Sequence, residues 1–130
     1  MQRQGNHDFY MFPGGRIELH KDSLSAIKRE LMEELNINED VNLSYIGENF
    51  INFPGLKYHE ISFFYKLVID ENKYGYYDSE YDCLDLNEGK SKYKWIKLDE
   101  IDNYKINPEI MKEKLKKEST NIEHFIYREF

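Results

Sequence analysis

The segment from residue 23 to residue 35 constrains the fold more than any other part of this sequence. Its apolar residues Leu24, Ile27, Leu31 and Leu35 recur at spacings of three, four and four, which places them on one stripe of an α-helix. A helix with one apolar stripe buries that stripe against another layer of the protein. The spacing therefore predicts an amphipathic helix over residues 23–35 within a layered fold.

Both ends of this helix carry recognisable signals. Asp22 or Ser23 can cap the first turn, because a short polar side chain accepts a hydrogen bond from a backbone N–H that has no partner inside the helix. Asn36 follows the last apolar residue, and asparagine tolerates the left-handed backbone conformation that often ends a helix. We therefore expect the helix to end just before Asn36.

Three glutamates share the face of this helix that lies away from the apolar stripe. Glu30, Glu33 and Glu34 stand at i, i+3 and i+4, so their carboxylates repel one another by roughly a few tenths of a kcal/mol per pair. A bound Mg²⁺ or Mn²⁺ would reverse the sign of that energy, because these ions take carboxylate oxygens as ligands. A solvated acidic face without a ligand is the alternative. Arg29 is expected to pair with Glu33 one turn further on.

The rest of the chain is richer in strand signals than in helix signals. A turn at residues 13–15 precedes a short alternating stretch, and Pro54-Gly55 separates two long stretches of β-branched and aromatic residues. Strands are expected over residues 16–19, 42–53, 57–69, 93–96 and 122–127, and helical segments over residues 99–102 and 108–117. This combination of strands and helices predicts an α+β fold, an α/β/α sandwich around a mixed sheet.

Length, charge and cysteine content limit the class of protein. A chain of 130 residues is expected to form a single domain over residues 1–130. Its net charge of −7 at pH 7 argues against duplex nucleic acid or an anionic membrane as the main partner. Cys83 is the single cysteine and the first residues lack a signal-peptide pattern, so a cytoplasmic protein is expected.

A longer pattern surrounds the three glutamates. Gly15 is followed by five residues, Lys21, seven residues, and then Arg29-Glu30-Leu31-x-Glu33-Glu34-x-Asn36-Ile37. This pattern resembles the Nudix box of the Nudix hydrolases, and it departs from the box at Lys21 and Asn36, where the family has glutamate and glycine. The segment from Trp95 to Ile101 is also similar to a Trp-containing segment of that family.

The resemblance implies a loop–helix–loop carried on a mixed-sheet sandwich. It implies hydrolysis of a diphosphate linkage in a small nucleotide-like compound, a nucleoside diphosphate linked to another group X. Carried over by position, Glu30, Glu33 and Glu34 would bind Mg²⁺ or Mn²⁺ together with the carbonyl of Gly15. One of these glutamates, or a loop glutamate, would activate water, and Arg29 would orient a carboxylate.

The departures from the family pattern lead to further expectations. Lys21 places a cation near the carboxylates, where it would weaken metal binding, contact a substrate phosphate, or tune an activity that the glutamates carry. Gly15 is preceded by 14 residues, and Met1 to Asn6 lacks a strand pattern, so we expect the family's N-terminal strands to be missing. An open sheet edge would favour a homodimer.

Residues outside the box have two interpretations each. Glu88 would bind substrate or metal from a loop, or it would be a solvated charge. The histidines show no metal-ligand spacing and are expected to be structural. A tyrosine cluster would stack on a nucleobase or form one face of a strand; it comprises Tyr74, Tyr76, Tyr77 and Tyr81.

Two classes of function remain open. The first is a metal-dependent Nudix-type pyrophosphohydrolase. The second is a catalytically weak or inactive module of the same fold that binds a nucleotide or metabolite, with catalysis lost through Lys21 and the short N-terminal segment. The intact glutamate trio favours the hydrolase, because a pure binding module has no need to retain three repelling carboxylates.

Overall fold

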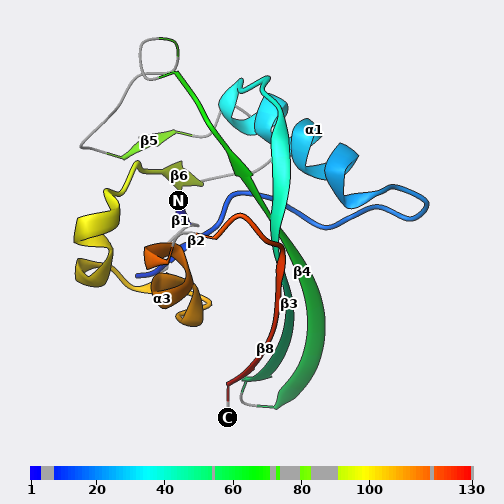
Figure 1. Ribbon diagram of the computed structural model, residues 1–130. Coiled ribbons are helices and arrows are strands. Elements are labelled where there is room, and N and C mark those ends of the chain that lie inside the picture. Colours follow the sequence, from blue (N-terminus) through cyan, green and yellow to red (C-terminus); the bar gives the residue numbers. More distant parts are fainter. Residues whose placement is uncertain are drawn as a thin grey trace. The chain divides into compact units, whose positions relative to one another are not determined.

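The computed structural model describes residues 1–3, 8–53, 55–70, 73, 80–82, 91–117 and 119–129 (Figure 1). The chain forms two compact units, each built from two stretches of sequence: Met1–Glu39 with Ile69–Lys117, and Asp40–Val68 with Glu118–Phe130. Each unit contains one mixed sheet, and together they give the α+β class that the sequence predicts. The single domain over residues 1–130 stays a prediction. None of the helices described is both long and apolar enough to cross a bilayer.

The first unit contains a five-stranded sheet with the order β5-β6-β1-β2-β7. Strand β2 runs parallel to β7, and the other neighbouring pairs are antiparallel. The strands are short: β1 is Gln2–Arg3, β2 is Tyr10–Met11, β5 is Tyr81–Asp82, β6 is Lys92–Tyr93 and β7 is Ile106–Asn107. The same unit carries the helix α1 (Ser23–Leu35), the 3₁₀ helix η2 (Leu98–Asn103) and the helix α3 (Ile110–Lys116).

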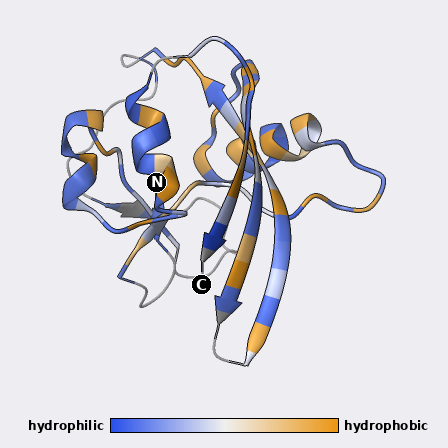
Figure 2. Cartoon of the chain, turned by 60° about the horizontal axis from the view of Figure 1, so that its bottom comes forward, coloured by the Kyte–Doolittle hydropathy of each residue, from blue (hydrophilic) through white to orange (hydrophobic). Residues whose placement is uncertain are grey.

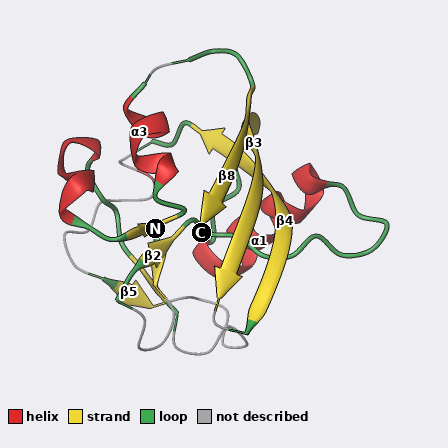
Figure 3. Ribbon diagram, turned by 90° about the horizontal axis from the view of Figure 1, so that it is seen from below, coloured by secondary structure: helices red, strands yellow, loops and turns green. Residues whose placement is uncertain are grey.

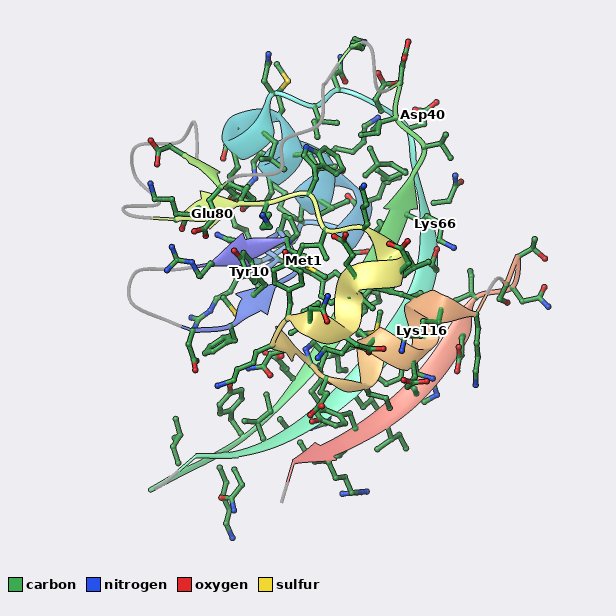
Figure 4. The ribbon with its side chains drawn as sticks, turned by 90° about the vertical axis from the view of Figure 1, so that its left-hand side faces the viewer. Met1, Tyr10, Asp40, Lys66, Glu80 and Lys116 are labelled. Atoms are coloured by element: carbon green, nitrogen blue, oxygen red, sulfur yellow. The ribbon has the colours of Figure 1, made fainter. Side chains whose placement is uncertain are left out.

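The expectation that residues 1–6 form no strand is wrong. Gln2 pairs with Tyr93 of β6 on one side and with Met11 of β2 on the other, so β1 lies inside the sheet. The buried side-chain amide of Gln2 donates to Ser91 Oγ at 3.3 Å. Pairing on both sides holds a strand of two residues that shows no alternating pattern of its own. Figure 4 labels Met1, which precedes β1, and Tyr10, which begins β2.

The helix α1 spans the predicted residues, and both of its ends have the predicted chemistry. Of the two candidate caps the structure selects Asp22, whose carboxylate accepts a hydrogen bond from the Ser25 N–H at 2.9 Å. Asn36 adopts the left-handed conformation with φ 53° and ψ 38°. The N–H groups of Asn36 and Ile37 then reach back to the carbonyls of Met32 and Leu31, both at 3.1 Å. These bonds satisfy carbonyls that the end of a helix leaves without partners.

The strand expected over residues 16–19 is not formed. The segment is irregular, and the side chain of Leu19 is 85% exposed, so the alternation of polar and apolar residues marks no buried face. The Lys21 N–H donates to the Glu18 carbonyl at 3.0 Å, and His20 has a positive φ of 65°. This tight turn over residues 18–21 leads the chain into α1. It occupies the second half of the segment that was expected to be a strand.

The second unit is a three-stranded sheet with the order β4-β3-β8 (Figure 3). Strands β3 (Val41–Phe53) and β4 (Leu56–Leu67) form the hairpin predicted around residues 54 and 55, and Gly55 has the positive φ of 79° that a tight turn requires. Strand β8 (Glu123–Glu129) runs parallel to β3 and confirms the strand expected near the end of the sequence.

Each unit buries its own set of side chains. In the middle of β3 every second residue is buried, namely Tyr45, Gly47 and Asn49, as the period of two of a strand requires. Figure 2 shows that the long strands carry both hydrophobic and hydrophilic residues. In the first unit the buried apolar residues come from α1, the segment after it, β6, η2, β7 and α3: Ala26, Leu31, Ile37, Tyr93, Ile101, Ile106 and Met111.

Candidate functional site

The loop before α1 passes directly against a carboxylate of that helix. A Cβ atom added to Gly15 would lie 2.7 Å from Glu30 Oε1 and 3.1 Å from its Cδ. Only a residue without a side chain permits this approach while Glu30 keeps its present position. The structure thus brings together Gly15 and Glu30, two residues of the expected site, within the first unit.

Arg29 ties the same carboxylate to a second acidic residue of the loop. Its guanidinium donates to Glu30 Oε1 at 3.0 Å and to Glu18 Oε1 at 2.9 Å. The expected partner Glu33 acts on the guanidinium through its charge, while the hydrogen bonds go to Glu30 and to Glu18, which the folded-back loop offers. Glu30 is only 12% exposed, so this ion pair is better shielded from water than an ordinary surface pair.

Glu18 is the site residue that the sequence analysis missed. It lies three residues after Gly15, in the segment that was expected to be a strand. The available signal was its acidic side chain in a loop that leads into a helix with an arginine. Spacing along the helix could not reveal this contact, because the two partners come from different elements.

Glu34 departs from the predicted distribution of the three carboxylates. The sequence placed all three glutamates on the face away from the core, yet Glu34 is 1% exposed while Glu33 is exposed. The Tyr93 hydroxyl of β6 donates a hydrogen bond to Glu34 Oε2. A buried carboxylate needs such a donor, because its desolvation otherwise costs several kcal/mol, by order of magnitude. The tyrosine explains why this glutamate can turn inward.

Lys21 is exposed in the turn that precedes the helix. Its neighbour Asp22 has a pKa below the usual value, mainly because the backbone N–H and the hydroxyl of Ser25 donate to its carboxylate. The charge of Lys21 lowers the same pKa by a smaller amount. The cation that replaces the family's glutamate is therefore solvated at the start of α1.

Several other candidates lie elsewhere or outside the residues described. Glu88, Cys83, His7 and most of the tyrosine cluster fall in the part of the chain that the structure does not describe, as do the side-chain surroundings of Tyr81. In the second unit, His124 Nε2 lies 2.7 Å from Glu48 Oε2 and His59 Nε2 lies 4.0 Å from Glu48 Oε1. These two histidines lie beside the same carboxylate on an exposed part of the sheet. This arrangement is compatible with the structural role expected of them.

The residues partly fit the divalent cation that the Nudix pattern implies. Carboxylate and carbonyl oxygens are the donors that Mg²⁺ and Mn²⁺ prefer, and the missing Cβ of Gly15 lets the loop backbone meet Glu30. Within the described ranges, however, no three His, Cys, Asp or Glu side chains are grouped so that they could hold a metal ion. The donor chemistry fits, and the Glu33 and Glu34 carboxylates would have to turn toward Glu30.

Comparison with known proteins assigns the chain to a family. No curated protein matches it in sequence. A family model described as "NUDIX domain" matches residues 1–117, which include the loop, α1 and the five-stranded sheet. The match therefore covers most of the chain, and it includes Gly15, Arg29 and the glutamates described above. This chain belongs to the Nudix family.

Proposed function

We propose that this protein is a cytoplasmic, divalent-metal-dependent hydrolase that cleaves a diphosphate linkage in a nucleoside diphosphate linked to another group X. The observation that carries the proposal is the contact between Gly15 and Glu30. It joins the first residue of the Nudix box to the first of its three glutamates, which comes from the helix that follows the loop. Membership of the Nudix family supports hydrolysis of pyrophosphate bonds as the class of reaction.

In this proposal Glu30, Glu33, Glu34 and the Gly15 carbonyl hold Mg²⁺ or Mn²⁺. When bound, the cation neutralises phosphate oxygens and lowers the pKa of a coordinated water molecule. Arg29 keeps Glu30 beside Gly15 through its hydrogen bonds to Glu18 and Glu30.

Glu33 has a second task besides metal binding. It is the exposed carboxylate of the trio, so its oxygens can accept a proton from a water molecule. Lys21, also exposed, is a candidate contact for a substrate phosphate. Glu88 is a second candidate for substrate binding, from a loop outside the described residues.

The test is a panel of nucleoside diphosphate compounds incubated with Mg²⁺ or Mn²⁺, with phosphate release as the readout. The double variant Glu33→Gln/Glu34→Gln should lose turnover by orders of magnitude, because it removes two charges from the metal ligand set. Glu109→Gln, which neutralises an exposed glutamate outside the box, is the matched control and should retain full activity. Equal activity in all three proteins would exclude the proposed site.

One observation favours a second candidate, a nucleotide- or metabolite-binding module without catalysis. No group of three metal-binding side chains is formed within the described ranges. The same panel decides between the two candidates. Saturable binding of a nucleotide with no phosphate release would support the module, and metal-dependent release that the double variant loses would support the hydrolase.

We also propose that the protein forms a homodimer. Strands β4 and β8 are the two edges of the three-stranded sheet, and large apolar side chains are exposed on both, including Ile61 and Phe63 of β4 and Ile126 of β8. Exposed apolar patches and open edges favour association. Light scattering over a range of protein concentrations should give the mass of two chains, and a monomer at all concentrations would contradict the proposal.

A further inference from the structure

The hydrogen bond between Tyr93 and Glu34 holds one of the three box glutamates in the interior of the first unit. Glu34 lies in the last turn of α1, and Tyr93 lies on β6. Both residues are 1% exposed, so bulk water does not compete for this contact. Because the acceptor is a carboxylate, the bond is charge-assisted and roughly twice as strong as one between neutral groups. The contact therefore stabilises the inward position of Glu34.

The strand that carries Tyr93 is fixed on both sides. Tyr93 pairs with Gln2 of β1 and with Tyr81 of β5, so β6 is an inner strand of its sheet. Just after it, the Lys94 N–H donates to the Met1 carbonyl at 2.9 Å. The backbone that carries the phenol therefore has little freedom to shift, and the hydroxyl cannot follow Glu34 if the carboxylate turns away.

The inward position of Glu34 separates it from the other two glutamates. Glu30 lies against the loop at Gly15, and Glu33 is exposed. Among the residues that the structure describes, no three acidic, histidine or cysteine side chains form a group that could hold a metal ion. Glu34 completes such a group only after it has left the Tyr93 hydroxyl.

The helix allows this movement without a change of its backbone. Glu30 and Glu34 stand at i and i+4, where Cβ atoms are about 5–6 Å apart, so rotation of the Glu34 side chain can bring the two carboxylates together. Without a cation the two charges repel each other, which favours the inward position. A divalent cation attracts both carboxylates and favours the outward position. The two positions are therefore stabilised under opposite conditions.

We propose that the hydrogen bond from Tyr93 to Glu34 is an autoinhibitory contact, which holds the site in a metal-free arrangement and is released when a divalent cation binds. This inference rests on the proposed function, in which Glu34 is a metal ligand. The hydroxyl and the cation compete for one carboxylate, so the contact lowers the apparent affinity of the site for the cation. Tyr93 lies outside the box of residues 15–37 that marks the family.

The first experiment removes only the hydroxyl, with the variant Tyr93→Phe. Calorimetric titration with Mn²⁺, below the melting temperature of each protein, should show affinity about tenfold tighter than in the wild type, as expected when a hydrogen bond to a charged group no longer has to be broken. The matched control is Tyr45→Phe, which removes the hydroxyl of a buried tyrosine in the second unit and should leave Mn²⁺ affinity unchanged. Unchanged or weaker affinity in Tyr93→Phe would overturn the inference.

Thermal unfolding of the same proteins gives a second readout. In EDTA the Tyr93→Phe protein should melt below the wild type, because the buried Glu34 carboxylate loses a donor. In saturating Mn²⁺ this difference in melting temperature should close, because the bond is already broken in the metal-bound wild type. A tyrosine that serves stability alone would keep the same difference in both conditions, as Tyr45→Phe should.

The second experiment asks whether Tyr93 acts through Glu34. In a Glu34→Gln background, Tyr93→Phe should change Mn²⁺ affinity by less than about twofold, because residues in contact are coupled and their effects are not additive. Crystals of the wild type grown with EDTA and with Mn²⁺ test the same contact if Tyr93→Phe does not fold. With Mn²⁺ the Glu34 carboxylate should bind the ion and lie beyond hydrogen-bond reach of the Tyr93 hydroxyl. A carboxylate that binds Mn²⁺ while it keeps this hydrogen bond would overturn the inference.

The possible outcomes separate the inference from the proposed function. If neither the wild type nor Tyr93→Phe binds Mn²⁺, both are overturned. Wild-type binding that is lost in Glu33→Gln/Glu34→Gln but is not tighter in Tyr93→Phe would overturn the autoinhibitory contact and leave the proposed function intact. An equal gain from Tyr93→Phe with and without Glu34→Gln would also overturn the contact, since the hydroxyl would then act through another group.

Discussion

Gly15 lies so close to Glu30 that a methyl group on its Cα would sit 2.7 Å from the Oε1 atom of the carboxylate. The variant Gly15→Ala would therefore displace the Glu30 carboxylate and break its 3.0 Å hydrogen bond to Arg29. We expect Mn²⁺ affinity to fall about tenfold or more, as for other losses of ligand support. The melting temperature should change little, because the displaced atoms end a flexible side chain. Calorimetry and thermal unfolding measure the two effects.

The control for this prediction is the same substitution in a Glu30→Ala background. There the added methyl group meets no carboxylate, so Gly15→Ala should have less than about a twofold effect on Mn²⁺ affinity. An equal effect in both backgrounds would mean that Gly15 acts through something other than Glu30.

Restoring the family's acid with Lys21→Glu tests the largest departure from the Nudix box. The change replaces a positive charge with a negative one, so it shifts the local charge before α1 by two units, and it should tighten Mn²⁺ binding. Because Lys21 is exposed, solvent screening limits the gain to a few-fold at most. Lys28→Glu is the matched control, since helical spacing places Lys28 on the other side of α1 from the three glutamates. A fall in turnover with Lys21→Glu alone would instead assign the lysine to a substrate phosphate.

The cap of α1 predicts a specific dependence of stability on pH. Hydrogen bonds from Ser25 lower the pKa of Asp22 from its usual value of 3.8, so the cap stabilises the folded state above that pH. The contribution is lost as the pH falls below 3.8 and through the pKa of the folded state. We expect Asp22→Ala to have a lower melting temperature than the wild type at neutral pH. The difference in melting temperature should become smaller in acid. Asp22→Asn keeps an uncharged cap, so it should melt above Asp22→Ala even in acid.

A glycine in the second unit is required for packing. A Cβ atom on Gly47 of β3 would lie 2.5 Å from Phe125 Cζ, and the Phe125 ring is buried and cannot move away freely. Gly47→Ala should destabilise the protein by about 1–3 kcal/mol, a typical cost of overpacking. Urea unfolding measures this loss. The double variant Gly47→Ala/Phe125→Leu replaces the ring with a smaller side chain. It should be destabilised by less than the sum of the two single substitutions.

The parts of the fold that the sequence predicted are those determined by local chemistry. The helix α1 begins at an aspartate cap and ends at a left-handed asparagine, and both signals lie within a few residues of the boundary. The hairpin of β3 and β4 follows from β-branched and aromatic residues on either side of a turn. In each case the residues that decide the structure are neighbours in the chain.

The features that the sequence could not predict depend on distant partners. Strand β1 has no pattern of its own and exists because Tyr93 and Met11 pair with Gln2 from both sides. Within the candidate site, the inward turn of Glu34 depends on the Tyr93 hydroxyl, a residue of another element. The choice of Glu18 as the partner of Arg29 depends on how the loop folds back.

The parallel pairing of β3 with β8 also governs how this protein can form on the ribosome. Strand β3 leaves the exit tunnel early and can close its hairpin with β4 at once, since the two are adjacent in sequence. Its other edge must wait for β8, which is translated only after α3. During that interval the nascent chain displays a bare strand edge, a template for pairing with a neighbouring chain. The protein should therefore depend on chaperones during synthesis, and slowing elongation before β8 should increase aggregation.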